Sequence, residues 1–176
     1  MSTKDLPPAA ETVIIGAGIV GNSMAYWLAE MGREDIVQID KGPLPDPGGS
    51  TGHASNFMFP VTASKMITQL SQRSREIYRE MDTWEEAGAL EVARTEERLD
   101  QFERQVHLAK AWGESAEILS VEEVSDLIPF VNEDVVEGGF YAPNGGTADP
   151  LRAGEIMRER AMDKGALSVF ANTEVT

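Results

Sequence analysis

Apolar residues follow two different periods within the first forty residues of the chain. Residues 12–15, TVII, form a short β-branched run that favours a strand buried on both faces. The run ends at Gly16, and from Ile19 apolar residues recur at helical spacing as far as Gly32, a residue type common at helix C-termini. Residues 35–40, DIVQID, have the pattern of a second strand. This order of strand, glycine turn, helix and strand predicts a βαβ unit.

Four further helices are predicted by apolar periodicity and by capping residues. Apolar residues recur at helical spacing over residues 64–86 and 95–113. A serine followed three residues later by a glutamate forms a capping box, which begins a short helix over residues 120–128. An Asp-Pro pair places an N-cap and an N1 residue before a last helix, over residues 150–164.

The remaining apolar segments predict strands and one turn region. Strands are expected at residues 88–94, 116–120 and 166–176, and a hairpin with a loop at 136–150. The final strand is expected to lie parallel to the first two. The chain is therefore predicted to be an α/β protein, an incomplete Rossmann-like domain with inserted helices. Residues 1–11 form an N-terminal tail, and residues 12–176 form the domain.

Charge and composition exclude several classes of function. The net charge is −15, with 30 acidic and 15 basic residues, so the chain should repel nucleic acid and anionic membranes. No apolar run reaches the roughly 20 residues of a membrane span, and the N-terminus lacks a signal core, which predicts a cytoplasmic location. The chain has no cysteine and only two histidines, so we expect no metal site.

The turn after the first strand carries a dinucleotide-binding signature. Gly16, Gly18 and Gly21 have the G-x-G-x-x-G spacing, in which the middle glycine has no side chain to block a pyrophosphate. Asp40 ends the second strand about 20 residues later, where a carboxylate can accept hydrogen bonds from ribose hydroxyls and repel a 2′-phosphate. The alternative is a structural glycine turn followed by a solvated acid. The signature alone leaves NAD and FAD open.

The loop after the second strand favours FAD. An NAD domain usually continues promptly to a third strand, whereas here residues 48–56, GGSTGHASN, form a glycine-rich polar loop. Ser50 and Thr51 can donate hydroxyl hydrogen bonds, and the glycines permit close approach of the backbone to a ligand. The same loop holds His53, which a purely structural loop would not need.

Five segments of the chain resemble one known group of flavoproteins. They are VIIGAGIVG, QIDKGPLPDPGGSTGHASN, LEVARTEERL, AKAWG and GGTADP. They are similar to the N-terminal part of the dimethylglycine oxidase and sarcosine dehydrogenase group, within the D-amino-acid oxidase superfamily. The resemblance extends from about Thr12 to Thr176. It implies the N-terminal part of an FAD-binding domain, truncated before the substrate domain.

The resemblance also implies a reaction and its partners. Such an enzyme oxidises the C–N bond of a small N-methylated amino acid by hydride transfer to flavin. It uses a small amine substrate and an electron acceptor, either oxygen or an electron carrier. Exposed apolar surface is expected where the rest of such a protein would pack. Two alternatives stay open: a superfamily member acting on another amino or hydroxy acid, and a non-catalytic nucleotide-binding subunit or fragment that needs a partner chain.

The residues that would hold the flavin follow from the same resemblance. In that group the histidine of the Gly-Gly-Ser-Thr-x-His motif bonds covalently to the flavin 8α-methyl carbon, and here that residue is His53. The alternative is a polar loop histidine near a non-covalent flavin. No catalytic residue and no metal ligand is assigned. The other implied cofactor contacts are Gly16, Gly18 and Gly21 in the turn, Ile19 and Val20 through their backbone, Asp40 and Lys41 beside the ribose, Ser50, Thr51 and Phe57 on the flavin side, Gly52 in the same loop, and Val175 at the adenine.

Overall fold

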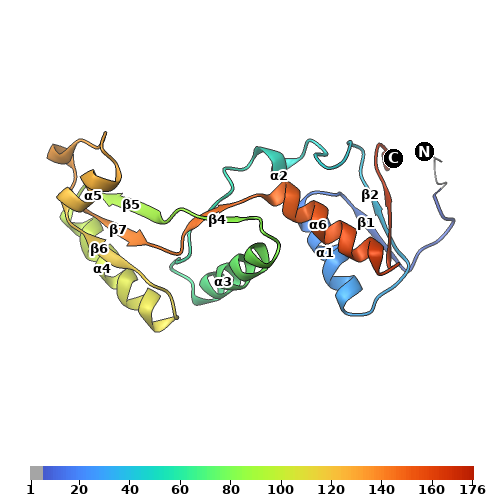
Figure 1. The fold of residues 1–176 in the computed structure, drawn as a ribbon, viewed down its shortest axis with the longest axis horizontal. Coiled ribbons are helices and arrows are strands. Elements are labelled where there is room, and N and C mark those ends of the chain that lie inside the picture. The colour runs from blue at the N-terminus through green and yellow to red at the C-terminus, as the bar shows by residue number, and fades with distance from the viewer. Residues whose placement is uncertain (1–5) are drawn as a thin grey trace. The chain divides into compact units, whose positions relative to one another are not determined.

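The computed structural model describes residues 6–176, which divide into two compact units. The first unit comprises the described residues up to Ser55 together with Asp149–Thr176, and the second comprises Asn56–Ala148. In Figure 1 the first unit is coloured blue and red and the second green to orange. The sequence predicts one domain over residues 12–176, and it carries no signal for this division.

No helix within the described part is long and apolar enough to cross a membrane.

The first unit is built on a parallel sheet. Strands β1 (Thr12–Ile15), β2 (Ile36–Ile39) and β9 (Leu167–Phe170) pair in the order β1-β2-β9. This arrangement confirms the α/β, Rossmann-like fold and the parallel pairing of the last strand. β9 is shorter than predicted, because the chain leaves the sheet after Phe170 and the amides of residues 172 and 173 bond to the carbonyls of residues 42 and 40.

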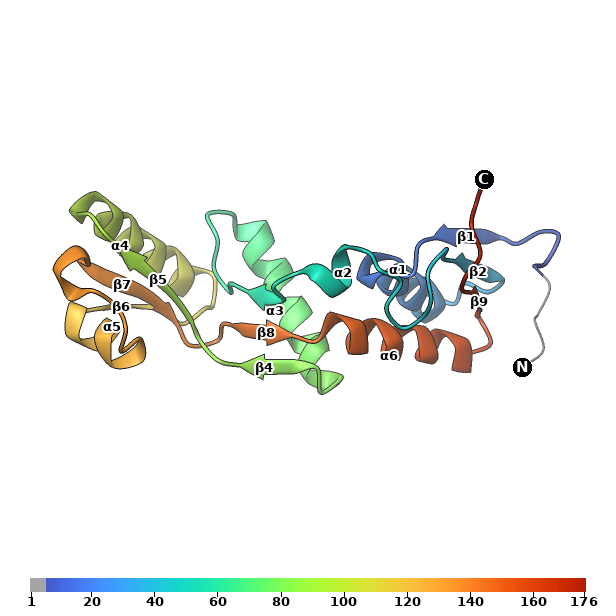
Figure 2. The ribbon, with the colours of Figure 1, turned by 90° about the horizontal axis from the view of Figure 1, so that it is seen from above.

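Two helices lie side by side against the sheet of the first unit, α1 (Ile19–Glu30) and α6 (Pro150–Asp163) (Figure 2). A third, four-residue helix, α2 (Ser50–His53), follows the loop after β2. The predicted capping of α6 is confirmed, since the Asp149 carboxylate accepts a hydrogen bond from the Arg152 amide at 2.9 Å. The helices and the sheet enclose a core of small and aliphatic side chains: Ala25, Ala29, Ile36, Ala161, Ala166 and Leu167.

The buried face of α1 differs from the apolar stripe that the sequence suggests. Val20 and Met24 are 77% and 52% exposed, whereas Asn22, Ala25 and Ala29 are buried. Small residues form the buried face because the helices approach closely. Val13 and Ile15 of β1 are also more than half exposed, so an apolar surface extends over this edge of the first unit.

The second unit contains two antiparallel sheets. The first has the order β3-β8-β4 and the second β5-β7-β6. Their strands are β3 (Phe57–Met58), β4 (Trp84–Glu86), β5 (Ala89–Ala93), β6 (Glu117–Leu119), β7 (Gly138–Ala142) and β8 (Gly146–Ala148). The helices are α3 (Lys65–Glu80), α4 (Glu96–Ala111), α5 (Val121–Leu127) and the 3-10 turn η1 (Glu133–Val135).

Two predictions for the second unit are wrong. The helix predicted over residues 64–86 ends at Glu80, because Asp82 adopts a left-handed conformation with φ 54° and the chain then forms β4. The hairpin predicted over residues 136–150 does not form. β7 pairs with β5 and β6, whereas β8 pairs with β3 and β4, so the two successive strands belong to different sheets.

The predicted apolar face of α4 forms the main core of the second unit. Phe102, Val106 and Ala109 are buried, and Phe102 packs against Phe140 of β7 with ring centroids 5.7 Å apart. α3 is different, because its buried side contains Thr68 and Arg75 whereas Leu70 is exposed. Polar contacts therefore hold one side of α3.

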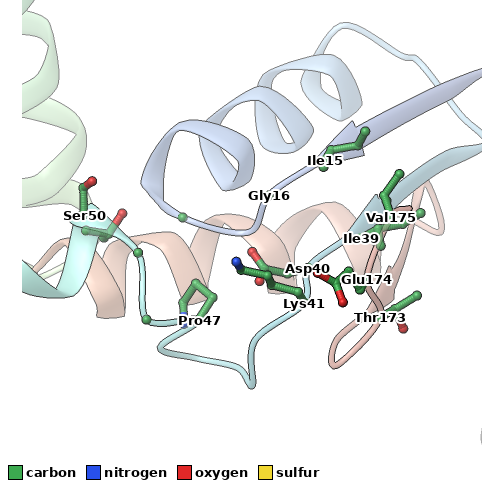
Figure 3. A pocket seen from close by; sticks show the side chains of 14 residues that line it. Ile15, Gly16, Ile39, Asp40, Lys41, Pro47, Ser50, Thr173, Glu174 and Val175 are labelled. Atoms are coloured by element: carbon green, nitrogen blue, oxygen red, sulfur yellow. The ribbon is translucent and has the colours of Figure 1, made fainter.

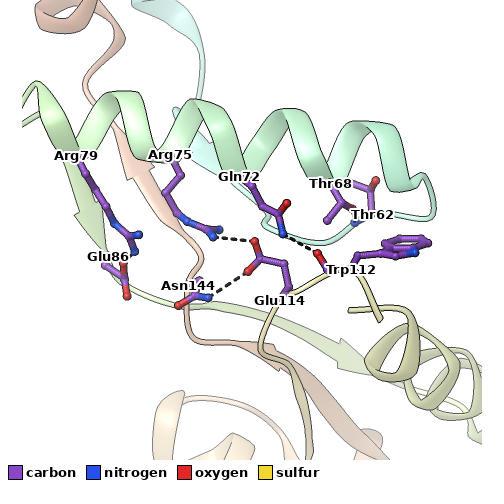
Figure 4. Close-up of polar contacts among 9 residues, drawn as sticks. All are labelled: Thr62, Thr68, Gln72, Arg75, Arg79, Glu86, Trp112, Glu114 and Asn144. Carbon is purple, nitrogen blue, oxygen red and sulfur yellow. Dashed lines mark hydrogen bonds and ion pairs between the residues drawn. The ribbon is translucent and has the colours of Figure 1, made fainter. Parts of the chain in front are cut away.

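A buried ion pair joins α3 to the segment after α4 (Figure 4). Arg75 and Glu114 are 8% and 4% exposed, and the Arg75 guanidinium donates to the Glu114 carboxylate at 2.7 Å. The second carboxylate oxygen accepts a hydrogen bond from the Asn144 amide at 3.1 Å. Gln72 adds a bond from its side chain to the Trp112 carbonyl at 2.9 Å. Because both charges are buried, removing one leaves the other uncompensated.

Replacing Glu114 by alanine should therefore destabilise the chain by about 3 kcal/mol or more, because it leaves the Arg75 charge buried and unpaired. Urea denaturation followed by circular dichroism measures the change. Glu76→Ala is the control, since its ion pair with Arg73 is exposed and should contribute less than about 1 kcal/mol. Equal losses in the two variants would contradict this account of α3.

Candidate functional site

A cleft in the first unit lies where the glycine turn, the end of β2 and the C-terminal segment meet (Figure 3). Its volume is about 590 Å³. It is lined by Ile15, Gly16, Gly18, Ile39, Asp40, Lys41, Pro47, Gly48, Gly49, Ser50, Thr51, Thr173, Glu174 and Val175. The cleft is at the carboxyl ends of β1 and β2, where open α/β sheets bind their ligands.

The glycine turn brings backbone to the cleft without side chains. Gly16 has φ 112°, a conformation that side chains disfavour, and its amide donates to the Ile39 carbonyl at 2.8 Å. Gly21 lies so close to the turn that a Cβ atom there would be 2.0 Å from the Gly16 carbonyl oxygen. α1 therefore begins directly behind the cleft, and its N-terminal amides and partial positive charge favour an anionic ligand.

The Asp40 carboxylate bonds to the glycine turn on one side and to the loop after β2 on the other. One carboxylate oxygen accepts a hydrogen bond from the Ala17 amide at 2.6 Å, and the other accepts from the Gly42 amide at 2.8 Å. Its own backbone is held by Phe170 and Thr173. An ionised carboxylate has about four acceptor sites, so Asp40 can accept further hydrogen bonds from a ligand while keeping these two. In Figure 3 it lies between the glycine turn and the loop of Pro47.

The loop after β2 folds over the start of α1. Thr51 accepts a hydrogen bond from the Ile19 amide through its hydroxyl oxygen at 3.0 Å, and the same oxygen lies 2.9 Å from where a Cβ atom on Gly18 would be. The exposed His53 imidazole is at the end of α2, where Nδ1 lies 2.9 Å from the Gly49 carbonyl oxygen. A carbonyl only accepts hydrogen bonds, so Nδ1 is the donor in this contact and Nε2 is left without a partner in it.

The cleft brings together seven of the residues that the sequence predicts as cofactor contacts: Gly16, Gly18, Asp40, Lys41, Ser50, Thr51 and Val175. Ile19, Val20 and Gly21 line an adjoining surface beside β1 and α1, together with Gly16, Gly18 and Thr51. Gly52 and His53 are exposed on α2 and do not line the cleft. Phe57 belongs to the second unit, so the described cleft does not include it.

Several residues of the site carried no signal that sequence reasoning used. Pro47, Thr173 and Glu174 line the cleft. The position of Val175 in the same segment was the only pointer to Thr173 and Glu174, and Pro47 had none. Asn22 and Gln38 lie behind the turn and bond to its carbonyls. A glutamine within the otherwise apolar strand run IVQI was the available signal for Gln38. Among residues 6–176, no group of three histidine, aspartate or glutamate side chains could hold a metal ion.

The fold and the cleft define a Rossmann-type dinucleotide-binding domain. A scan against protein families matches residues 11–176 to the family described as FAD dependent oxidoreductase, DAO. The chain belongs to this family. The glycine turn, the start of α1 and the Asp40 carboxylate fit the diphosphate and ribose of FAD.

Relatives and solved structures agree with this assignment. The chain is 30% identical to human mitochondrial sarcosine dehydrogenase, over 99% of this chain and 20% of that protein. It is 34% identical to mitochondrial dimethylglycine dehydrogenase of Rattus norvegicus, over 90% of this chain and 19% of that protein. L-proline dehydrogenase from P. horikoshii superposes with a TM-score of 0.86 at 25% identity, covering 97% of this chain and 46% of that one. The chain therefore spans about a fifth of the length of these curated relatives.

Gly21→Ala should destabilise the chain by about 2 kcal/mol or more, because the new methyl group would overlap the Gly16 carbonyl. A loss of stability would be informative, because alanine is otherwise more favourable than glycine within a helix. Thermal or urea unfolding measures the change. Gly49→Ala is the matched control at the same site: Gly49 has φ −88° and nothing within 4 Å of an added Cβ. A Gly21→Ala variant as stable as Gly49→Ala would show that the turn is not closely packed.

Proposed function

We propose that this chain is the FAD-binding portion of an oxidoreductase that oxidises the C–N bond of a small N-methylated amino acid, of the dimethylglycine or sarcosine type. One observation carries the proposal: the glycine turn at the start of α1 and the Asp40 carboxylate line the same cleft. The substrate class is supported by the names of the two relatives, sarcosine dehydrogenase and dimethylglycine dehydrogenase.

Each part of the cleft suits one part of the cofactor. Gly18 and the start of α1 would hold the diphosphate, with the Thr51 hydroxyl beside them. Asp40 would accept hydrogen bonds from the adenosine ribose, with Lys41 beside it. Val175 would contact the adenine, and Ser50 and Thr51 would lie on the flavin side.

His53 is proposed to attach the flavin covalently. Its Nδ1 is engaged with the Gly49 carbonyl, which leaves Nε2 of the exposed imidazole as the nucleophile. Attachment would break one C–H bond of the flavin 8α-methyl group and the imidazole N–H bond and form one C–N bond. Two protons would pass to solvent and two electrons to the electron acceptor.

The bound flavin would supply the redox chemistry by accepting a hydride from the carbon next to the substrate nitrogen. The residues of this chain bind and orient that cofactor. Because the chain spans about a fifth of its curated relatives, we propose that polypeptide beyond these 176 residues supplies the substrate-binding groups, either in the same chain or in a partner. The electron acceptor is oxygen or an electron carrier.

Asp40→Asn should weaken ADP binding about tenfold, because hydrogen bonds from ribose hydroxyls to a charged acceptor are lost or weakened. ADP is the probe because it contains the adenosine and diphosphate parts of FAD. Isothermal titration calorimetry measures the affinity. Asp100→Asn, on the exposed surface of α4 in the second unit, is the control and should bind as the unchanged chain does. Equal affinity in both variants would contradict the role of Asp40.

Expression in riboflavin-sufficient cells should yield a yellow protein whose intact mass under acid is raised by one FAD less two hydrogens. His53→Ala should lose this increase, because Nε2 is the attached atom. His107→Ala replaces the other histidine, which is exposed on α4, and should retain it. Flavin that leaves the unchanged protein on acid precipitation would refute the covalent bond. A colourless protein that binds ADP would favour a non-catalytic nucleotide-binding subunit.

A further inference from the structure

Two polar side chains are fully enclosed behind the glycine turn. Asn22 of α1 is 2% exposed and Gln38 of β2 is 0% exposed. Gln38 Nε2 donates to the Gly16 carbonyl and to Asn22 Oδ1, both at 3.1 Å. Asn22 Nδ2 donates to the Ala17 carbonyl at 3.0 Å. The pair therefore holds two successive carbonyls of the turn from the side away from the cleft.

Holding these carbonyls also fixes two amides. In a trans peptide unit the C=O and the following N–H point in opposite directions. The bond to the Gly16 carbonyl thus directs the Ala17 amide outward, where it donates to Asp40 at 2.6 Å. The bond to the Ala17 carbonyl directs the Gly18 amide outward in the same way. Gly18 lines the cleft, and its amide has no acceptor within the described part of the chain.

Asn22 and Gln38 occupy a packed position where polar side chains carry an energetic cost. Gln38 lies in register between Ile14 and Val169 on the helix-facing side of the sheet, where an aliphatic residue would pack without polar cost. Its Oε1 atom is buried without a hydrogen-bond partner, which is unfavourable. Gly154 of α6 makes room for the pair, because a Cβ atom there would be 2.8 Å from Asn22 Nδ2.

We propose that Asn22 and Gln38 are positioning residues for diphosphate binding. They touch no ligand themselves. They hold the turn so that the Gly18 amide faces the diphosphate and the Ala17 amide faces Asp40. The inference rests on the proposed function, because it requires a nucleotide diphosphate in this cleft.

The test compares two ligands that differ only in the diphosphate. Titration calorimetry with ADP and with adenosine is carried out on the unchanged chain, on Asn22→Ala and on Gln38→Met. The ratio of ADP affinity to adenosine affinity should fall about tenfold in each variant, because a misdirected Gly18 amide weakens only the diphosphate contact. Both ligands bind the folded chain, so partial unfolding alone leaves the ratio unchanged. Two variants keep the test available if one does not fold.

Val169→Ala is the matched control, because it removes buried side chain from the neighbouring strand and keeps the amide pair. It should lower the melting temperature and preserve the ratio. Unchanged ratios in both Asn22→Ala and Gln38→Met, with preference for ADP retained, would overturn the positioning role and leave the proposed function standing. An equal fall in Val169→Ala would also overturn it. An unchanged chain that binds neither ligand would overturn the proposed function itself, and this inference with it.

Discussion

The site depends on the backbone of residues 16–18 being held from both sides. On one side the Ala17 amide donates to Asp40, and on the other the carbonyls of Gly16 and Ala17 accept hydrogen bonds from buried amides. Peptide groups at such a turn would otherwise be free to rotate, and an amide that rotates away from the cleft cannot bind an anion. β2 contributes to both restraints, because it carries Gln38 within the strand and Asp40 just after it, while Asn22 of α1 holds the Ala17 carbonyl.

The close packing of the first unit follows from this requirement. Gly21 brings α1 against the turn, and Gly154 brings α6 against Asn22. Small residues form the buried face of α1, and the larger Val20 and Met24 remain exposed. The second unit has a different basis of stability, an aromatic core around Phe102 and a buried ion pair between Arg75 and Glu114.

The sequence predicted the features that depend on local pattern. The βαβ unit, the glycine turn, the Asp149 cap and the buried face of α4 are each encoded within a few neighbouring residues. The features it missed depend on distant partners. β7 and β8 look like a hairpin, yet each pairs with strands far away in the chain. The roles of Asn22 and Gln38 depend on β2 lying beside the turn. No local sequence pattern predicts that contact. Seven predicted cofactor contacts share one cleft, whereas the assignment of Phe57 to the flavin stays a prediction.

A crystal structure of the chain with bound ADP tests the central claim most directly. We expect the diphosphate to accept a hydrogen bond from the Gly18 amide, and the ribose hydroxyls to donate to the Asp40 carboxylate. The bonds from Asn22 and Gln38 to the turn should be retained. ADP bound elsewhere, or a turn whose Gly18 amide points away from the diphosphate, would contradict the account.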